Sequence, residues 1–223
     1  MPRIARGLVD GFIYHILNRG NDRQKVFHKD QDYKVFVSLI EESKSKFLVK
    51  IFAYCLMPNH FHIVGMPIKG EELSRWMQWL MTSHVRRYHQ HNGTSGHIWQ
   101  GRYKSFIIQE DNHLLTVLRY VEGNPVRAEL VTSAKDWRWS SHGERIGLLP
   151  AKLITQIPIK LPDNWDKFVD EPLTLKEIDK VHISLNRQSP FGETNWQQKI
   201  CKEFKLESTI TRRGRPRKIQ TKK

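Results

Sequence analysis

The order of elements in residues 11–108 predicts an α+β fold, in which an antiparallel sheet carries helices on one face. Strand-like and helix-like patterns follow one another as strand, helix, strand, strand, helix, strand. That order is the ferredoxin-like arrangement. The turn-forming pair Pro58-Asn59 separates the two middle strands, as an antiparallel hairpin requires. Hydrophobic residues make up 39% of the 223 residues, which is enough for one buried core and a small appendage.

The first half of this pattern is the clearest. Residues 11–18 form the first predicted strand, and His15 within it is expected to be a hydrogen-bonded core or edge histidine rather than a metal ligand. Residues 30–46 are predicted to be helical because their apolar side chains recur at helical spacing. Two predicted strands, 48–56 and 60–66, follow on either side of the turn.

A second amphipathic helix is predicted over residues 71–90, and a fourth strand over residues 98–108. The fourth strand places Arg102 and Lys104 among three aromatic residues, Trp99, Tyr103 and Phe106. Such alternation suits single-stranded nucleic acid, because cations contact the backbone and rings stack on bases. An ordinary strand with one solvated face explains the pattern equally well.

A third helix is predicted over residues 111–123, with Asp111 as its cap. At about 100° per residue, His113, Tyr120 and Asn124 fall along one flank of its apolar stripe. Pro125 disfavours a helical conformation at Asn124, so the direction of that side chain stays open.

The charge balance points to a polyanionic partner. The net charge is +14 and the isoelectric point about 9.9, which favours nucleic acid first and an anionic membrane surface second. No apolar run approaches a membrane span. The N-terminus lacks the pattern of a signal peptide, and two cysteines do not indicate a disulfide framework. We therefore expect a cytoplasmic, nucleoid-associated protein.

The segment His60-Phe61-His62 is the first candidate for chemistry. Side chains alternate along a strand, so His60 and His62 point to one face and Phe61 to the other. Two neighbouring imidazoles can bind a divalent metal. Taken alone, so short a motif more often marks two solvated histidines.

A polar loop follows the first strand. Arg19, Asn21 and Arg23 carry groups that hydrogen-bond phosphates and base edges. A solvated turn without a ligand is an equally good interpretation.

Five segments in this order resemble a known family. They are Tyr14-His15-Ile16-Leu17-Asn18-Arg19-Gly20, Met57-Pro58-Asn59-His60-Phe61-His62, Trp99-Gln100-Gly101-Arg102-Tyr103, Tyr120-Val121-Glu122-Gly123-Asn124-Pro125-Val126-Arg127-Ala128 and Asp136-Trp137-Arg138-Trp139-Ser140-Ser141. With these five segments, the chain resembles the REP-associated tyrosine transposases. These are bacterial relatives of the single-tyrosine HUH transposases of IS200-like insertion sequences.

The resemblance implies a metal-dependent, site-specific single-strand DNA nuclease and strand transferase that acts on hairpin DNA during transposition. Tyr120 would be the nucleophile and would form a 5′-phosphotyrosine, and His60, His62 and Asn124 would bind Mg²⁺ or Mn²⁺. Among the other tyrosines, Tyr103 is the strongest rival because it lies beside two cations. Arg102, Lys104 and Arg127 are candidate DNA contacts, and a monomer or homodimer is expected.

The predicted organisation has three parts: the transposase domain at 1–145, a small helical appendage at 146–207 and a basic tail at 208–223. The last 13 residues hold seven Arg or Lys and no acid. Arg213 and Arg217 flank the segment Gly214-Arg215-Pro216, and this Gly-Arg-Pro sequence suits an A·T-rich minor groove. A nonspecific solubilising tail is the alternative.

Two further functions compete with the nuclease. One is a binding module without turnover, either an RNA-binding protein on a ferredoxin-like sheet or a domesticated transposase that only binds hairpins. The other is a replication initiator or relaxase with the same chemistry. The tyrosine motif resembles that of the transposon group, which disfavours the replication initiator or relaxase.

Overall fold

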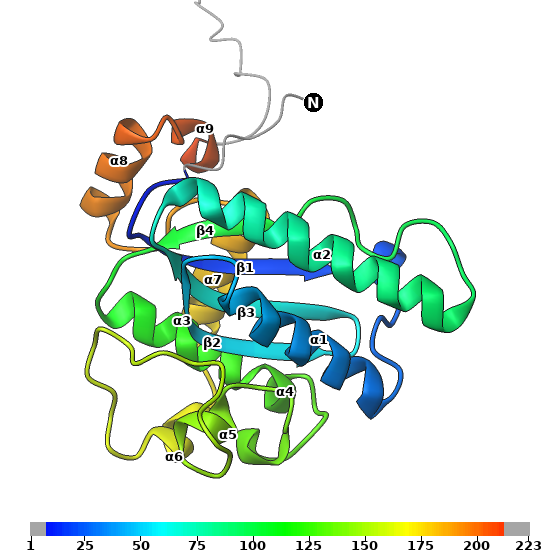
Figure 1. Ribbon diagram of the computed structural model, residues 1–223. Helices are drawn as coiled ribbons and strands as arrows, with labels where there is room; N and C mark the ends of the chain where they lie inside the picture. Colours follow the sequence, from blue (N-terminus) through cyan, green and yellow to red (C-terminus); the bar gives the residue numbers. More distant parts are fainter. Residues whose placement is uncertain (1–7, 212–223) are drawn as a thin grey trace, which may run out of the picture.

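The computed structural model describes residues 8–211 and contains one antiparallel sheet of four strands (Figure 1). The strands are β1 (Ile13–Arg19), β2 (Val49–Met57), β3 (His60–Pro67) and β4 (Lys104–Ile108). Their spatial order is β2-β3-β1-β4, and every neighbouring pair is antiparallel. The predicted α+β fold with its antiparallel sheet is confirmed.

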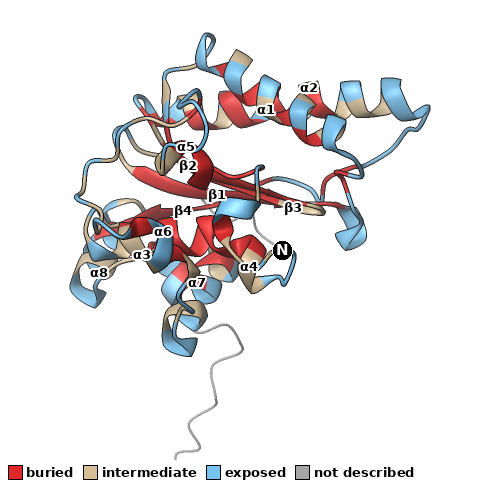
Figure 2. Ribbon diagram, turned by 90° about the horizontal axis from the view of Figure 1, so that it is seen from below, coloured by how far each residue is buried: buried red, intermediate tan, exposed pale blue. Residues whose placement is uncertain are grey.

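Helices α1 (Asp30–Lys44) and α2 (Gly70–Asn92) cover one face of the sheet (Figure 2). The two helices pack on each other and bury a core rich in aromatic side chains. Phe61 points into this layer, where its ring lies 5.1 Å from that of Phe36. The strand alternation that places Phe61 here directs its two histidine neighbours to the opposite face.

The opposite face is covered by α3 (Asn112–Glu122), the short α4 (Asn124–Arg127) and α7 (Leu175–Arg187) (Figure 2). Asp111 caps α3 as predicted, because its side chain accepts a hydrogen bond from the backbone N–H of His113 at 2.7 Å. The apolar side of α3 packs against β2, and α7 packs against α3 and β4. This second layer carries Tyr120 and Asn124.

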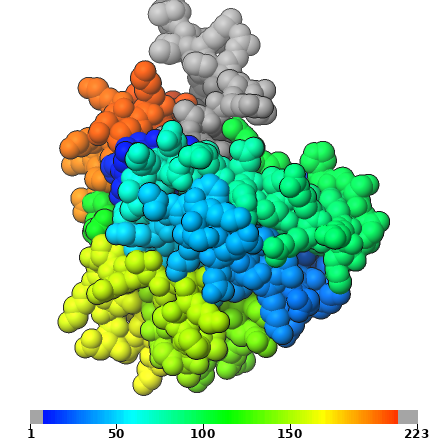
Figure 3. All heavy atoms as spheres, viewed as in Figure 1, coloured from blue at the N-terminus to red at the C-terminus, as the bar shows by residue number. Residues whose placement is uncertain are grey.

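The remaining elements are η1 (Asn21–Arg23), η2 (Ala134–Asp136), α5 (His142–Arg145), α6 (Trp165–Asp170), α8 (Thr194–Glu203) and α9 (Glu207–Ile210). In Figure 3 the orange α8 region lies beside the blue start of the chain, and Phe12 meets Phe204 edge-on. The division at residue 146 stays a prediction. Within the described chain, no helix combines the length and apolarity needed to cross a bilayer.

The fourth strand differs from its prediction. It begins at Lys104 rather than at residue 98, because Gly101 has a φ of +66° and turns the chain just before the strand. Trp99, Tyr103 and Phe106 are all buried, and Trp99 packs edge-on against Phe61. The suggestion that these rings stack on bases is therefore wrong, and they belong to the core.

Candidate active site

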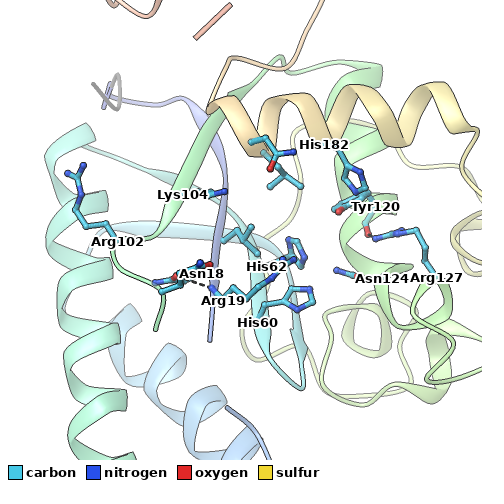
Figure 4. Close-up of a pocket in the computed structure, with 14 residues that line it drawn as sticks. Asn18, Arg19, His60, His62, Arg102, Lys104, Tyr120, Asn124, Arg127 and His182 are labelled. Atoms are coloured by element: carbon cyan, nitrogen blue, oxygen red, sulfur yellow. Dashed lines mark hydrogen bonds between the residues drawn. The ribbon is translucent and has the colours of Figure 1, made fainter. Parts of the chain in front are cut away.

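A pocket of about 380 Å³ opens where β1, β3 and β4 face α3, α4 and α7 (Figure 4). Eight of the residues singled out from the sequence line it, although they are scattered over more than a hundred positions: Arg19, His60, His62, Arg102, Lys104, Tyr120, Asn124 and Arg127. The fold therefore assembles one site from the histidine motif, the tyrosine motif and the basic residues.

The two histidines come from the start of β3 and project into the pocket together. Their ring centroids lie 4.9 Å apart, with the ring planes nearly perpendicular. Burial lowers the pKa of His60 to about 3, and Arg19 and Arg127 add to this effect. Burial, together with neighbouring His60, also lowers the pKa of His62. Both imidazoles are therefore neutral near pH 7, as metal ligands must be.

Tyr120 reaches the pocket from the last turn of α3 and is 5% exposed. Its ring centroid lies 5.7 Å from that of His62. The Arg127 guanidinium carbon lies 4.1 Å from the centre of the Tyr120 ring, and Arg127 also donates to the Tyr120 carbonyl oxygen at 3.1 Å. Burial raises the pKa of the Tyr120 phenol, and the positive charge of Arg127 opposes part of that rise.

The sequence did not predict the direction of the Asn124 side chain. Gly123 ends α3, and Asn124 starts α4 with its side chain lining the same pocket. It is 7% exposed, and its Nδ2 atom is buried without a hydrogen-bond partner among the described residues. A buried amide N–H without an acceptor costs free energy, unless a ligand supplies the acceptor.

The donor set fits a divalent metal. Two neutral imidazoles and one carboxamide face the same cavity (Figure 4), and such nitrogen and oxygen donors suit Mn²⁺ or Mg²⁺. Within residues 8–211, no cluster of three or more His, Cys, Asp or Glu side chains could hold an ion. His60, His62 and Asn124 would thus supply three donors, and solvent or substrate oxygens would fill the other positions.

The pocket is strongly cationic. Arg19, Arg102, Lys104 and Arg127 line it, with Arg102 at the outer rim (Figure 4). Among the described residues, none that lines the pocket is acidic. A concave site with four cations and no carboxylate attracts an anion, and the phosphates of nucleic acid are the anions that the overall charge of +14 predicts.

Other residues predicted for the site lie elsewhere. Asn21 and Arg23 are exposed on η1 and do not line the pocket. Tyr103 is 6% exposed, and its hydroxyl lies 3.2 Å from Ser74 Oγ in the opposite layer, so it is not a neighbour of the histidines. Arg213, Arg215 and Arg217 lie outside the described residues.

The sequence did not indicate the contribution of α7. His182, Leu185 and Asn186 line the pocket, and the His182 ring stands edge-on to Tyr120 at 6.0 Å between centroids. The capping pair Thr174 and Glu177 marks the start of this helix. Nothing in its local pattern, however, says that the helix returns to the tyrosine.

Comparisons with known proteins show the family of the chain. Residues 8–124, just over half of the chain, match the family described as IS200-like transposases. A Haemophilus influenzae protein described as a REP-associated tyrosine transposase is 26% identical over 152 residues, which are 63% of this chain and 85% of that protein.

A solved structure, of a REP-associated tyrosine transposase bound to a REP hairpin, has the same fold. It superposes with a TM-score of 0.56 at 20% identity, over 72% of this chain and 95% of that one. The chain therefore belongs to the IS200-like transposase family and is a distant homologue of the REP-associated tyrosine transposases.

Proposed function

We propose that the protein is a metal-dependent endonuclease and strand transferase for single-stranded DNA that carries a hairpin. Membership of a transposase family implies a nuclease-type enzyme. The finer statement concerns Tyr120, which would join itself covalently to the 5′ side of the cleaved strand. His60, His62 and Asn124 would bind Mg²⁺ or Mn²⁺, and divalent metals are general in the family.

One observation carries this proposal. His62 on β3 and Tyr120 on α3 are 58 positions apart in the chain, yet their rings meet at 5.7 Å inside a cationic pocket. A phenol with a pKa near 10 is a weak nucleophile, and a phosphodiester repels it by charge. A nucleophile, metal donors and cations in one cavity answer both difficulties.

The proposed step breaks one bond and forms one. The Tyr120 oxygen attacks the scissile phosphorus while the phenol loses its proton. The P–O bond to the 3′ oxygen breaks, and that oxygen takes up a proton to become a free 3′-OH. A bound metal would polarise the phosphoryl oxygens. The phosphotyrosine bond conserves the energy of the ester, so a second 3′-OH can rejoin the strand without ATP.

The chain's own residues prepare this reaction. Arg127 lies against the Tyr120 ring and favours the phenolate, which burial alone would disfavour. Arg19 and Lys104 line the same cavity, where they would hold the phosphates on either side of the cut. Hairpin DNA is the proposed substrate because a structural relative was solved with a REP hairpin.

A binding role without turnover is the second candidate. Tyr120 is only 5% exposed, and the edge of α7 lies over it through His182. A nucleophile so covered would suit a protein that binds hairpins and does not cut them. This function predicts that DNA binds to the pocket and that no covalent adduct forms.

Labelled hairpin DNA with single-stranded flanks, incubated with Mn²⁺ and resolved on a denaturing gel, separates the two candidates. We expect a protein–DNA adduct with the wild type. Tyr120→Phe should form none and bind the hairpin within a few-fold of wild type, because its hydroxyl forms the bond and adds little to docking. Tyr103→Phe is the matched control and should keep the adduct. Wild-type binding without adduct would favour the second candidate.

A further inference from the structure

His60 and His62 are each hydrogen-bonded, among the described residues, through one ring nitrogen. His60 Nδ1 lies 2.6 Å from the side-chain oxygen of Asn59, and His62 Nδ1 lies 2.8 Å from His15 Nε2. In both cases the remaining nitrogen, Nε2, is the one available to a ligand in the pocket. Neither Asn59 nor His15 lines the pocket itself.

The direction of the first bond follows from its other partner. Asn59 Nδ2 donates to the Arg23 carbonyl oxygen at 3.0 Å, and a carbonyl oxygen can only accept. The amide of Asn59 is therefore fixed with its oxygen toward His60. Because that oxygen also only accepts, His60 Nδ1 must carry the proton, and Nε2 keeps its lone pair.

The support for Asn59 is built into the loop after β1. The Gly20 N–H donates to the Asn59 carbonyl oxygen at 2.7 Å. A side chain at Gly20 would place its Cβ 2.3 Å from the Gln24 carbonyl oxygen, so the loop can close this tightly only with glycine. The closure brings the Arg23 carbonyl within reach of the Asn59 amide.

The second bond, between His62 and His15, has two possible directions. If His15 donated, His62 would carry its proton on Nε2, and that nitrogen would have no lone pair for a metal. If His62 donates from Nδ1, its Nε2 is free for a metal. His15 is fully buried on β1, and its ring lies 4.9 Å from that of Phe106, so its Nε2 is held against His62 Nδ1. Accepting there places the His15 proton on Nδ1, which is buried without a hydrogen-bond partner among the described residues. A metal bound at His62 Nε2 would offset that cost, because it requires the His62 proton on Nδ1.

We propose that Asn59 and His15 are positioning residues, which hold His60 and His62 with Nε2 toward the pocket and with the proton on Nδ1. The inference rests on the proposed function, since it assumes that these histidines bind the metal. Groups that accept the second N–H of a metal-binding histidine fix its orientation and raise its basicity. Here one acceptor is an amide, and the other is a buried histidine.

The test measures Mn²⁺ binding by the full-length protein in the absence of DNA. Asn59→Leu and His15→Phe remove the acceptors at similar side-chain size, and Mn²⁺ affinity should fall about 10–100-fold in each. Asn59→Asp and His15→Gln are the matched rescue variants. Each presents an oxygen near the position of the lost acceptor, so affinity should stay within about fivefold of wild type, below the loss typical of a missing acceptor.

Nitrogen-15 NMR of the wild type, first without metal, gives a readout that does not depend on whether a variant folds. We expect a protonated Nδ1 on His60, and a coupling across the hydrogen bond between His62 Nδ1 and His15 Nε2. With diamagnetic Zn²⁺ added, the proton of that bond should lie on His62 Nδ1.

Three results have distinct meanings. A proton on His60 Nε2 in the wild type would overturn the inference. Mn²⁺ binding as tight as that of the wild type in both Asn59→Leu and His15→Phe would overturn it as well. Wild-type protein that shows the expected Nδ1 protons and binds no Mn²⁺ would support the orientation and overturn the proposed metal site.

Discussion

Tyr120 and Glu122 lie two residues apart on α3 and have opposite surroundings. Tyr120 faces a pocket in which Asn124 Nδ2 and Arg19 Nε have no hydrogen-bond partner among the described residues. Glu122 is fully buried on another side of the helix, and its two carboxylate oxygens accept four hydrogen bonds. One helix thus carries a tyrosine that faces unsatisfied polar groups and a carboxylate whose hydrogen bonds are completed within the protein.

The Glu122 carboxylate and its donors form what we call the Glu122 cluster, which consists of Glu122, Ser141, His142, Arg145 and Trp165. Of these, His142 Nε2 has no hydrogen-bond partner among the described residues. The four donors lie 2.6–3.0 Å from the carboxylate oxygens. Burial alone would raise the pKa of Glu122. The Arg145 guanidinium and the bonds from His142 and Ser141 outweigh it and lower that pKa to about 2. The cluster joins α3 to α5 and α6.

The difference separates fold from function. The buried Glu122 carboxylate is paired within the protein, because an unpaired buried polar group costs about 1–3 kcal/mol and a charged one more. A group that awaits a ligand is left incomplete at that cost. Substitutions in the pocket should therefore change activity more than stability, and those in the Glu122 cluster should do the opposite.

The largest effect is expected in the pocket. His60→Ala and His62→Ala should each lower cleavage on the order of 10³-fold, as loss of a catalytic group commonly does, because two donors hold the metal too weakly against water. The wild type should melt at a higher temperature with Mn²⁺ than without, and neither variant should. A Mn²⁺-dependent rise that survives in both variants would place the metal elsewhere.

The next effect concerns the Glu122 cluster. Glu122→Gln leaves Arg145 without its buried counter-charge and should cost about 3–5 kcal/mol in the free energy of unfolding. Urea denaturation measures this, with the exposed Glu110→Gln as control. Below the unfolding transition, the cleavage rate should stay within a few-fold of wild type. A stable Glu122→Gln variant without activity would instead show that Glu122 acts in catalysis.

The pH dependence of the unfolding free energy tests the stabilising role of Glu122. The pKa of Glu122 is lowered from 4.5 to about 2, so its ionised form stabilises the fold fully above about pH 4.5, and this is lost as the pH falls toward 2. The difference in unfolding free energy between wild type and Glu122→Gln should be constant from pH 7 to 5. It should narrow between pH 4.5 and 2.5. A difference that grows on acidification would contradict the assigned cause.

The smallest effect is expected from the basic tail, which lies outside the comparison of the two sites. Deleting residues 211–223 removes seven cations and should weaken hairpin binding and flatten its salt dependence. The position of the cut should not change, because the pocket is formed by other residues. A shifted cut would show that the tail sets the register on the DNA.

Much of the site could be predicted because its residues carry local signals. The alternation of His60, Phe61 and His62 follows from strand geometry, and the structure keeps it. The contribution of His182 could not be predicted, since it depends on how α7 packs across α3. The sequence could not show that Trp99 is buried. Aromatic residues alternate with cations in the same way whether their rings face solvent or lie in the core.

The most direct test of the central claim is to identify the residue that becomes linked to DNA. Hairpin DNA is trapped with the wild type and Mn²⁺, the complex is digested with protease and nuclease, and mass spectrometry locates the phosphorylated peptide. We predict a 5′-phosphate on Tyr120 that is lost when the metal is chelated and in His62→Ala. An adduct on Tyr103 or another tyrosine, or one that forms equally without metal, would contradict it.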